Sequence, residues 1–407
     1  MEYQISFSSD SNNLQKEFAT TRSFSSQHSL ASVPSLNSNS NSNSQFLNSS
    51  FTCITTLKLH TYISSLTLAG NFLYTGSSSK EITSWNITHF HSHPQESINT
   101  IVSGNGAVKS IVIHSDRLFT AHQDNKIRIW KITITNDGEL QQQHKFTRLA
   151  TLPTFTNRFT SILNPKNHVK IRFRRHKKCT WIHHVDTVSS LALSKDGTLL
   201  YSVSWDRTIK VWKTKDLTCL ESVQTAHDDA INAITVSNDG YVYTGSADKK
   251  IKVWKKEKGD KNHSLIDTLE KHRSGVNALA LNSDGSVLYS GACDRSILVY
   301  KRGENGNLVV MGALRGHTKS ILCLAVVSDL VCSGSEDKTI RIWRSNSNNV
   351  DREYCCLGVL EGHRGPIKCL IAVFDQFDEQ SSEATFLIYS GSLDCDVKVW
   401  KMFLPLL

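Results

Sequence analysis

Histidine, serine and aspartate recur together along this chain, in the combination that catalytic triads use for nucleophilic chemistry. In a triad the imidazole takes a proton from the hydroxyl, and the carboxylate orients the imidazole. A nucleophilic site is one local arrangement with an oxyanion hole, so periodic copies of the set indicate a structural role. The histidine precedes a turn aspartate by 20–22 residues in four pairs and by more in a fifth: His184/Asp206, His227/Asp248, His272/Asp294, His317/Asp337 and His363/Asp394.

An aromatic residue follows each of these turns at a constant offset of six residues. Between turn and aromatic, as in Thr208 to Trp212, polar residues alternate with β-branched or aromatic ones, which predicts a strand with one buried face. The pattern occurs seven times, at Ser79/Trp85, Asp124/Trp130, Asp206/Trp212, Asp248/Trp254, Asp294/Tyr300, Asp337/Trp343 and Asp394/Trp400. A period of about 43 residues with this signature is typical of propeller blades. The sequence therefore predicts an all-β, seven-bladed β-propeller.

These repeats resemble those of the WD40-repeat family, and the resemblance covers residues 51–407. It implies that histidine, a strand serine or threonine, the turn aspartate and the strand tryptophan form a hydrogen-bonded tetrad within a blade. Such a chain would give every buried polar group a partner. The matching sets are His184, Ser202, Asp206, Trp212; His227, Thr244, Asp248, Trp254; His272, Ser290, Asp294, Tyr300; His317, Ser333, Asp337, Trp343; and His363, Ser390, Asp394, Trp400. The first two repeats are degenerate, because His60 is offset by one residue and Gly104 replaces the histidine in the second.

The two ends of the repeat region predict how the ring closes. The last repeat ends at Trp400, and residues 401–407 are too few for a well-formed fourth strand, whereas residues 51–59 alternate like a strand. We therefore expect residues 51–59 to supply the outer strand of the seventh blade, leaving no open sheet edge. Residues 1–50 are rich in serine and asparagine and are expected to be a disordered tail in front of a propeller spanning 51–407.

Two insertions interrupt the repeats. Residues 149–152 fit the outer strand of the second blade, and residues 153–178 then form a basic insertion before the third blade. Residues 375–385 are expected to form an acidic loop in the seventh blade. Almost all of the net charge of +9 comes from residues 158–178, which hold eight basic residues and no acidic one, so the propeller body is close to neutral. The expected docking or nuclear-import segment consists of Lys170, Arg172, Arg174, Arg175, Lys177 and Lys178.

The basic run leaves three interpretations open: import or partner binding, a solvated hairpin with one charged face, and direct contact with nucleic acid. Phe173 is the only aromatic residue within it, which disfavours a base-stacking platform. Together with the phrases Leu-Pro-Thr and Asn-Pro-Lys-Asn and with Trp181-Ile182, the run resembles plant WD-repeat proteins of the Jingubang type. That resemblance implies a plant regulatory protein without enzymatic activity.

By resemblance, partners bind loops at one end of the channel, where the residue before each turn aspartate and those just after each histidine lie. The expected partner-binding face includes Gln123, Trp205, Glu336, Leu393, Asp228, Arg273, Lys319 and Arg364. Trp205 is the strongest candidate, because a large aromatic side chain in a turn suits an interface anchor. The alternative is that Trp205 packs on the neighbouring blade.

Other chemistry finds little support in the sequence. No glycine-rich phosphate loop and no Gly-x-Ser-x-Gly occurs, none of the ten cysteines forms a Cys-x-x-Cys pair, and His89, His91 and His93 fit a solvated loop better than a metal site. No signal peptide or membrane span is visible. We therefore expect no cofactor, no metal and no catalytic residue in a monomeric propeller that is cytoplasmic, nuclear or both.

The expected function is that of a non-enzymatic scaffold or adaptor for other proteins, in regulation or signalling in a plant cell. The alternatives are a nucleic-acid-associated factor that uses the basic insertion, and a substrate receptor of a ubiquitin ligase. Against the receptor, no Trp-Asp-x-Arg sequence follows any blade strand, and the residue after the blade aromatic is usually Lys or Arg.

Overall fold

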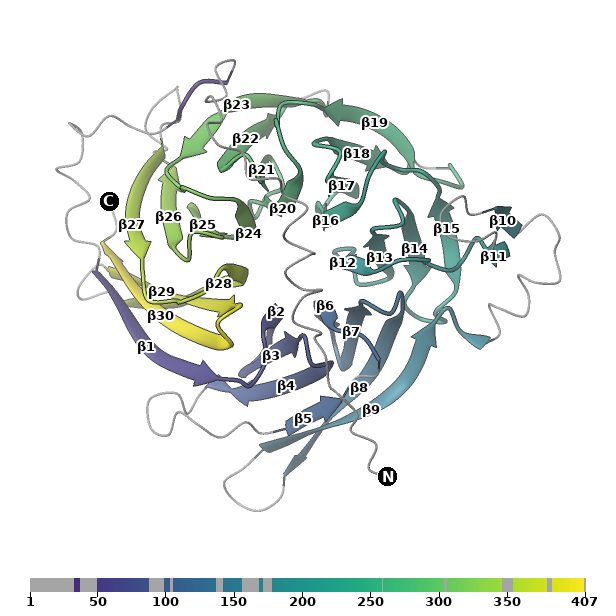
Figure 1. Ribbon diagram of the computed structural model, residues 1–407, viewed down its shortest axis with the longest axis horizontal. Coiled ribbons are helices and arrows are strands. Elements are labelled where there is room, and N and C mark those ends of the chain that lie inside the picture. Colours follow the sequence, from purple (N-terminus) through teal and green to yellow (C-terminus); the bar gives the residue numbers. More distant parts are fainter. Residues whose placement is uncertain are drawn as a thin grey trace, which may run out of the picture. The chain divides into compact units, whose positions relative to one another are not determined.

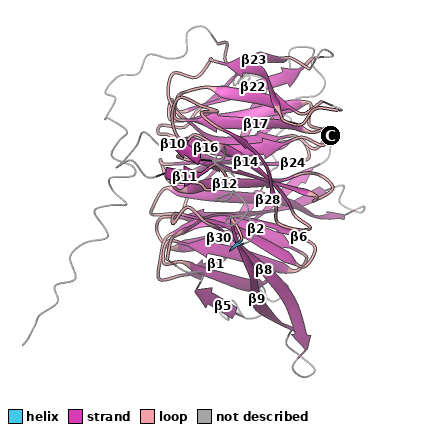
Figure 2. Ribbon diagram, turned by 90° about the vertical axis from the view of Figure 1, so that its right-hand side faces the viewer, coloured by secondary structure: helices cyan, strands magenta, loops and turns pink. Residues whose placement is uncertain are grey.

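A computed structural model describes residues 33–36, 50–87, 99–102, 105–136, 142–155, 168–170, 178–257, 259–303, 306–345, 354–378 and 383–405. Contacts divide the chain into Met1–Ser32, which lies outside the described residues, and Val33–Leu407, which is described below. Every named element of this second unit is a β-strand (Figure 2).

Seven four-stranded antiparallel sheets make up the ring, and one strand from each lies innermost (Figure 1). The innermost strands are β2 (Ile63–Ala69), β6 (Val108–His114), β12 (Val188–Leu193), β16 (Ile231–Val236), β20 (Val276–Leu281), β24 (Ile321–Val327) and β28 (Ile367–Asp378). The second strands are β3 (Phe72–Ser77), β7 (Arg117–His122), β13 (Leu199–Ser204), β17 (Tyr241–Ser246), β21 (Val287–Ala292), β25 (Leu330–Ser335) and β29 (Glu383–Ser392).

The third strands carry the repeat aromatic residues, and the fourth strands form the rim. The third strands are β4 (Glu81–Asn86), β8 (Ile127–Asn136), β14 (Ile209–Lys213), β18 (Ile251–Lys255), β22 (Ser296–Arg302), β26 (Ile340–Ser345) and β30 (Asp396–Pro405). The rim strands are β5 (Asn99–Val102), β9 (Gln142–Leu152), β15 (Cys219–Val223), β19 (Ser264–Leu269), β23 (Leu308–Arg315), β27 (Tyr354–Leu360) and β1 (Ser50–Lys58).

The ring closes through β1, as the sequence predicts. Strand β1 pairs antiparallel with β30, with Leu57 opposite Val397 and Thr52 opposite Lys401. Each innermost strand contacts the innermost strand of the next sheet, and β2 contacts β28 to complete the circle. The prediction of an all-β, seven-bladed propeller closed by an N-terminal strand is therefore confirmed.

Period-two alternation builds the core between neighbouring sheets. Val203 and Val211 of the third blade pack with Ile231 and Trp254 of the fourth blade, and all four side chains are buried. The sheets approach so closely that a Cβ added at Gly245 would lie 2.6 Å from Cγ1 of Val276 in the next sheet. Apolar side chains therefore face a neighbouring sheet on both sides of a blade, so each blade depends on its neighbours to bury them.

The expected acidic loop at 375–385 is largely an extension of two strands, so that part of the prediction is wrong. Strands β28 and β29 pair as far as Asp378 opposite Glu383, and only residues 379–382 of this stretch lie outside the described residues. The Phe374 and Phe386 rings meet edge to face at 5.5 Å. This cross-strand aromatic pair favours strand pairing, and the acidic composition of the residues between the two rings concealed it.

Only the two ends of the basic run belong to the described residues. Strand β10 (His168–Lys170) pairs antiparallel with β11 (Lys178–Thr180), and Lys170 lies opposite Lys178. This pairing agrees with the hairpin interpretation at its base. Arg172, Arg174, Arg175 and Lys177 lie outside the described residues, so their roles stay predictions.

The structure orders one segment of the expected disordered tail, which corrects that prediction for residues 33–36. Val33 and Leu36 are buried, and Ser35 forms a parallel bridge with Ala313 of β23. Residues 1–32 and 37–49 lie outside the described residues. The serine- and asparagine-rich composition of the whole tail concealed this segment, because the segment contributes only two buried apolar side chains, Val33 and Leu36.

We expect Leu57→Ala to lower the free energy of unfolding by about 2–5 kcal/mol, because it removes a buried side chain from the closing strand. Leu57 is 2% exposed and packs with Leu73, Trp85 and Val399 at the junction of the seventh and first blades. Chemical unfolding followed by tryptophan fluorescence measures the loss. Thr52→Ala, an exposed position on the same strand, is the control. Equal losses for the two variants would contradict closure through β1.

Candidate interaction face

A buried hydrogen-bonded chain crosses the third blade. His184 Nε2 lies 2.8 Å from Ser202 Oγ, and Trp212 Nε1 donates to the same oxygen at 2.9 Å. His184 Nδ1 lies 3.2 Å from Asp206 Oδ2. Since the indole can only donate, the hydroxyl proton of Ser202 is free for His184 Nε2, and Nδ1–H then points at the carboxylate. All four groups are thereby satisfied.

The same chain recurs in the fourth, sixth and seventh blades, and without an indole in the fifth. The imidazole Nε2 lies 2.7–2.8 Å from the hydroxyl and Nδ1 lies 2.8–2.9 Å from the carboxylate in the sets His227/Thr244/Asp248, His272/Ser290/Asp294, His317/Ser333/Asp337 and His363/Ser390/Asp394. Trp254, Trp343 and Trp400 donate to their hydroxyl oxygens at 2.8–3.0 Å. Tyr300 of the fifth blade is 1% exposed.

These chains hold the elements of a triad but not the access that a nucleophile needs. Ser202 and Thr244 are completely buried, and each hydroxyl already accepts an indole N–H. An acyl substrate cannot reach an oxygen enclosed in this way. The periodic sets are therefore structural.

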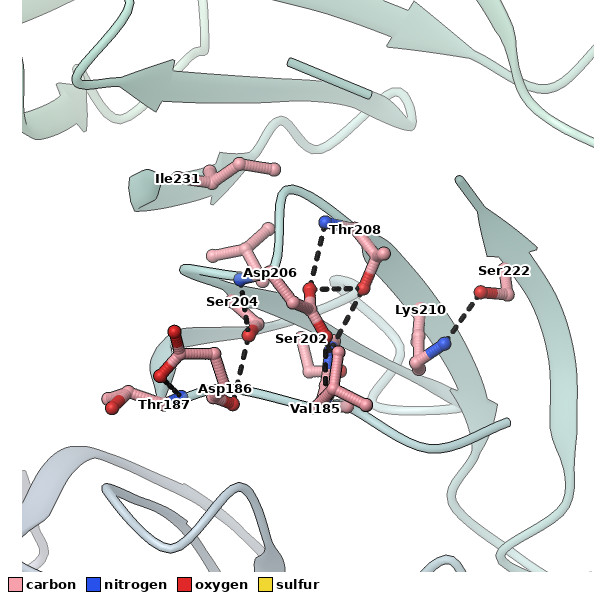
Figure 3. A network of polar contacts seen from close by, with 12 residues as sticks. Val185, Asp186, Thr187, Ser202, Ser204, Asp206, Thr208, Lys210, Ser222 and Ile231 are labelled. Carbon is pink, nitrogen blue, oxygen red and sulfur yellow. Dashed lines mark hydrogen bonds and ion pairs between the residues drawn. The ribbon is translucent and has the colours of Figure 1, made fainter. Parts of the chain in front are cut away.

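Asp206 also ties its turn to the loop that enters the third blade (Figure 3). Asp206 Oδ2 accepts from the backbone N–H of Val185 at 2.8 Å, and Oδ1 accepts from that of Thr208 at 3.0 Å. Burial opposes the charge on Asp206, yet His184 and these donors hold its pKa well below the usual range. The turn between second and third strands is thereby fixed against the loop that enters the blade.

The same link is present in four further blades. The turn aspartate accepts the N–H of the residue after the histidine at 2.7–3.0 Å in the pairs Asp228/Asp248, Arg273/Asp294, Thr318/Asp337 and Arg364/Asp394. Five loops and five turns are therefore joined at one end of the ring. In these five blades, buried carboxylates set the backbone that carries the expected partner-binding residues, whereas Gln123 lies in the second blade outside this set.

The second blade contains a histidine that the sequence analysis missed. His122 Nε2 lies 2.8 Å from Thr120 Oγ1, which accepts from Trp130 Nε1 at 3.1 Å, and His122 Nδ1 lies 3.2 Å from the Gly106 carbonyl oxygen. The blade thus keeps a hydroxyl–imidazole–indole chain, with a carbonyl in place of the carboxylate. The signal was a histidine two residues before the turn acid, at Asp124.

The first blade keeps less of the pattern. Trp85 Nε1 donates to Thr75 Oγ1 at 3.3 Å, and Ser79 replaces the turn aspartate. Its hydroxyl lies 3.0 Å from Thr61 Oγ1, so the turn and the entering loop are still linked, through two hydroxyl groups. The Ser79 hydroxyl also donates to Glu81 Oε2 at 2.9 Å, so a hydroxyl supported by a neighbouring carboxylate takes the place of the turn aspartate.

The expected partner-binding residues differ in exposure. Gln123, Asp228, Arg273, Lys319 and Arg364 are exposed, while Trp205, Glu336 and Leu393 are partly buried. Lys109 Nζ of the neighbouring blade lies 5.3 Å from the centre of the Trp205 ring, which agrees with packing on that blade, and the role of Trp205 as an anchor stays a prediction. Lys319 Nζ lies 3.8 Å from Glu336 Oε1, which makes a surface ion pair between two of these residues.

The residue that follows the turn aspartate, or Ser79 in the first blade, adds a feature that the sequence analysis did not identify. In all seven turns this residue has a left-handed backbone, with φ between 59° and 74°, although none is glycine. The seven residues are Lys80, Asn125, Arg207, Lys249, Arg295, Lys338 and Cys395. Five of them are basic, so basic side chains recur around the end of the ring that carries the turns.

Other kinds of site gain no support from the described residues. They contain no group of three or more His, Cys, Asp or Glu side chains placed to hold a metal ion, and His89, His91 and His93 lie outside them. The described part of the chain also has no helix long and apolar enough to cross a membrane.

Comparison with known families identifies the repeats. The family model described as the WD domain, G-beta repeat, matches residues 176–213, 218–255 and 354–401. The model described as the DDB1- and CUL4-associated factor 12 beta propeller matches residues 261–358, and the two models together cover over half of the chain. The chain therefore contains WD40 repeats. Neither of these two family models describes a catalytic family.

Curated relatives of this WD40 protein include three from Arabidopsis thaliana. It is similar to Autophagy-related protein 16, with 25% identity over 63% of this chain and 51% of that protein. It is also similar to Protein ROOT INITIATION DEFECTIVE 3, with 31% identity over 41% of each chain, and to Zinc finger CCCH domain-containing protein 62, with 28% identity over 40% of this chain and 38% of that protein. The chain spans about half the length, or less, of these relatives. The Jingubang-type resemblance stays a prediction.

We expect Asp248→Ala to lower the free energy of unfolding by about 1–3 kcal/mol, because three donors lose their acceptor. These donors are His227 Nδ1 at 2.8 Å and the N–H groups of Asp228 and Lys250 at 3.0 Å and 2.9 Å. Chemical unfolding at neutral pH measures the loss. Asp228→Ala is the matched control, because its side chain is 77% exposed and makes only a surface ion pair. If both variants lost the same stability, the assigned role of the turn acid would be wrong.

We expect His122 to make stability depend on pH in mildly acidic solution. Burial and the nearby Arg128 charge lower the pKa of His122 to about 4, so the unfolded chain takes up a proton near pH 6.5 that the folded chain resists. The free energy of unfolding should therefore fall as the pH drops from above 6.5 toward 4. From about pH 7.5 to 5, the native chain should lose roughly 2 kcal/mol more than His122→Asn. Parallel pH profiles for the two proteins would refute this assignment.

Proposed function

We propose that this WD40 propeller is a non-enzymatic adaptor that binds other proteins, in regulation or signalling in a plant cell. One observation carries the proposal: five loops and five turns at one end of the ring are joined by buried carboxylates. Backbone held in this way presents its side chains without an ordering cost at binding. The similarity to proteins of Arabidopsis thaliana supports the plant setting.

The expected partner-binding residues and the loops and turns that carry them are called the interaction face below. This face holds a tryptophan and arginines, which are common in protein-binding surfaces. Trp205 is partly exposed in its turn, and its neighbour Lys109 covers part of its ring. Exposed arginines at Arg273 and Arg364 lie in the entering loops of other blades. Tryptophan and arginine are the residues most enriched among binding hot spots, so we infer that Trp205 anchors the partner and Arg364 contributes.

A second candidate is a substrate receptor of a ubiquitin ligase. The observation that favours it is the match of residues 261–358 to the propeller model of DDB1- and CUL4-associated factor 12. On this proposal, one surface of the ring binds DDB1 and the interaction face recruits the substrate. A third candidate, association with nucleic acid through the basic insertion 153–178, predicts binding that nuclease or high salt abolishes.

Quantitative co-purification from plant cells tests these candidates, with tagged full-length chains and halves of each sample treated with nuclease. Trp205→Ala with Arg364→Ala should lower recovery of the partner proteins by roughly tenfold or more. The control pairs Leu149→Ala on the rim strand β9 with Lys215→Ala in the turn after β14, at the opposite end of that strand. Equal thermal unfolding temperatures would show that the face variant remains folded.

The outcomes separate the candidates. Partners that survive nuclease and are lost only with the face variant support the adaptor. If DDB1 is recovered with both the face variant and the control variant, while other proteins are lost only from the face variant, the result supports a substrate receptor. Recovery that collapses with nuclease would move the function to the basic insertion, and unchanged recovery with the face variant would overturn the assignment of the face.

A further inference from the structure

Residues 33–36 form a short extended segment that lies along the rim strand of the fifth blade (Figure 1). Leu36 N–H donates to the Ala313 carbonyl oxygen at 3.0 Å, and Ala313 N–H donates to the Pro34 carbonyl oxygen at 2.9 Å. Arg315 Nη2 donates to the Val33 carbonyl oxygen at 2.7 Å. The segment therefore runs parallel to β23 and uses the free edge of that strand.

The segment also reaches the sixth blade. Tyr354 N–H, at the start of β27, donates to the Leu36 carbonyl oxygen at 2.8 Å. The Tyr354 hydroxyl lies 3.0 Å from that of Tyr289 in the fifth blade. Backbone groups from two rim strands therefore hold one peptide at the junction of two blades.

Two side chains of the segment enter the propeller. Val33 is 3% exposed and Leu36 is 8% exposed, whereas Pro34 and Ser35 between them face outward. Leu36 packs in one cluster with Tyr289, Leu314 and Trp343. The two ends of a four-residue segment are thus buried, and its middle stays in solvent.

The propeller surface leaves room for this peptide backbone. A Cβ added at Gly312 would lie 2.5 Å from Leu36 Cγ and 2.9 Å from the Pro34 carbonyl oxygen. Gly312 lies within β23, where glycine ordinarily weakens a strand and often marks close approach of another backbone. Addition of a strand to a sheet edge, with pockets for selected side chains, is a recurring mode of peptide recognition.

We propose that the groove formed by β23 and the start of β27 is a peptide-binding site, and that Val33–Leu36 is its tethered resident ligand. The site takes an extended segment of the pattern aliphatic–Pro–x–Leu, presented by a partner protein and bound parallel to β23. This rim groove is separate from the loops and turns of the interaction face. It would let the propeller hold a second partner whenever its own segment is released.

The tether explains why the resident segment occupies the groove. Residues 37–49 connect Leu36 to β1, and a short connection gives a local concentration in the millimolar range. A free peptide at micromolar concentration therefore competes poorly with the resident segment. Disabling the resident segment should uncover a site that binds the same peptide from solution.

Fluorescence anisotropy with a labelled peptide of residues 31–38 tests the proposal on full-length chains. The double variant Val33→Asp with Leu36→Asp should have a disabled resident segment. It should therefore bind the labelled peptide at least roughly tenfold more tightly than the native chain does. Adding Gly312→Val should abolish that binding, because the new side chain occupies the space of Leu36. Adding Val309→Ala, at an exposed position on the same strand, should leave it unchanged.

A second preparation keeps the test decisive if the double variant fails to fold. A protease site placed within 37–49 lets the resident segment be cut from a folded native propeller, after which labelled peptide should exchange into the groove. Failure of the folded, cut chain to take up peptide would overturn the proposal, as would equal binding by native and disabled chains. If the native chain instead dimerised at high concentration by exchanging its resident segments, the source of the bound segment would be a second copy of this chain, which would overturn the assignment to a partner protein.

Discussion

The buried aspartate of each regular turn is the group on which the repeat depends. Asp206, Asp248, Asp294, Asp337 and Asp394 each accept from an imidazole and from the backbone N–H that follows that imidazole. Desolvation raises the energy of a buried carboxylate, and several donors offset that cost at once. Removing the carboxylate would leave several donors unpaired, so the turn and the entering loop are energetically coupled.

The degenerate blades show which part of this arrangement is required. In the second blade a carbonyl oxygen takes the place of the carboxylate, and His122 on the second strand takes the place of the loop histidine. In the first blade two hydroxyl groups link turn and loop. What persists is the hydroxyl that accepts from the third-strand tryptophan, at Thr75 and Thr120. A buried indole N–H always needs an acceptor, whereas the rest of the chain can be rebuilt from other polar groups.

Closure of the ring gives the molecule two kinds of surface. The ends of the strands carry the joined loops and turns, which expose side chains such as Arg273 and Arg364 while buried aspartates hold their backbone. The rim carries the edges of seven sheets, and such edges attract further strands unless they are covered. At β23 the edge is covered by Val33–Leu36, so a segment far away in sequence completes the hydrogen bonding there.

The sequence by itself determined the number of blades, the positions of four complete tetrads and the closing role of residues 51–59, whereas the tetrad predicted for the fifth blade lacks its last bond, because the Tyr300 hydroxyl has no hydrogen-bond partner among the described residues. Each depends on a repeated spacing, and a spacing that recurs seven times is specific because every blade packs against the next in the same way. Composition was a weaker guide. It concealed the extension of β28 and β29 through the acidic stretch 375–385, on either side of which Phe374 and Phe386 meet, and it concealed the two buried side chains of the serine-rich tail.

Only the tertiary structure decided what depends on contacts between distant residues. It placed His122 in the chain of the second blade, brought Lys109 over Trp205, and set Leu36 against Gly312. None of these pairs is fixed by a local period, because each depends on how close two strands or two sheets approach after the ring has closed. Packing geometry, rather than pattern, therefore selects the partners of these side chains.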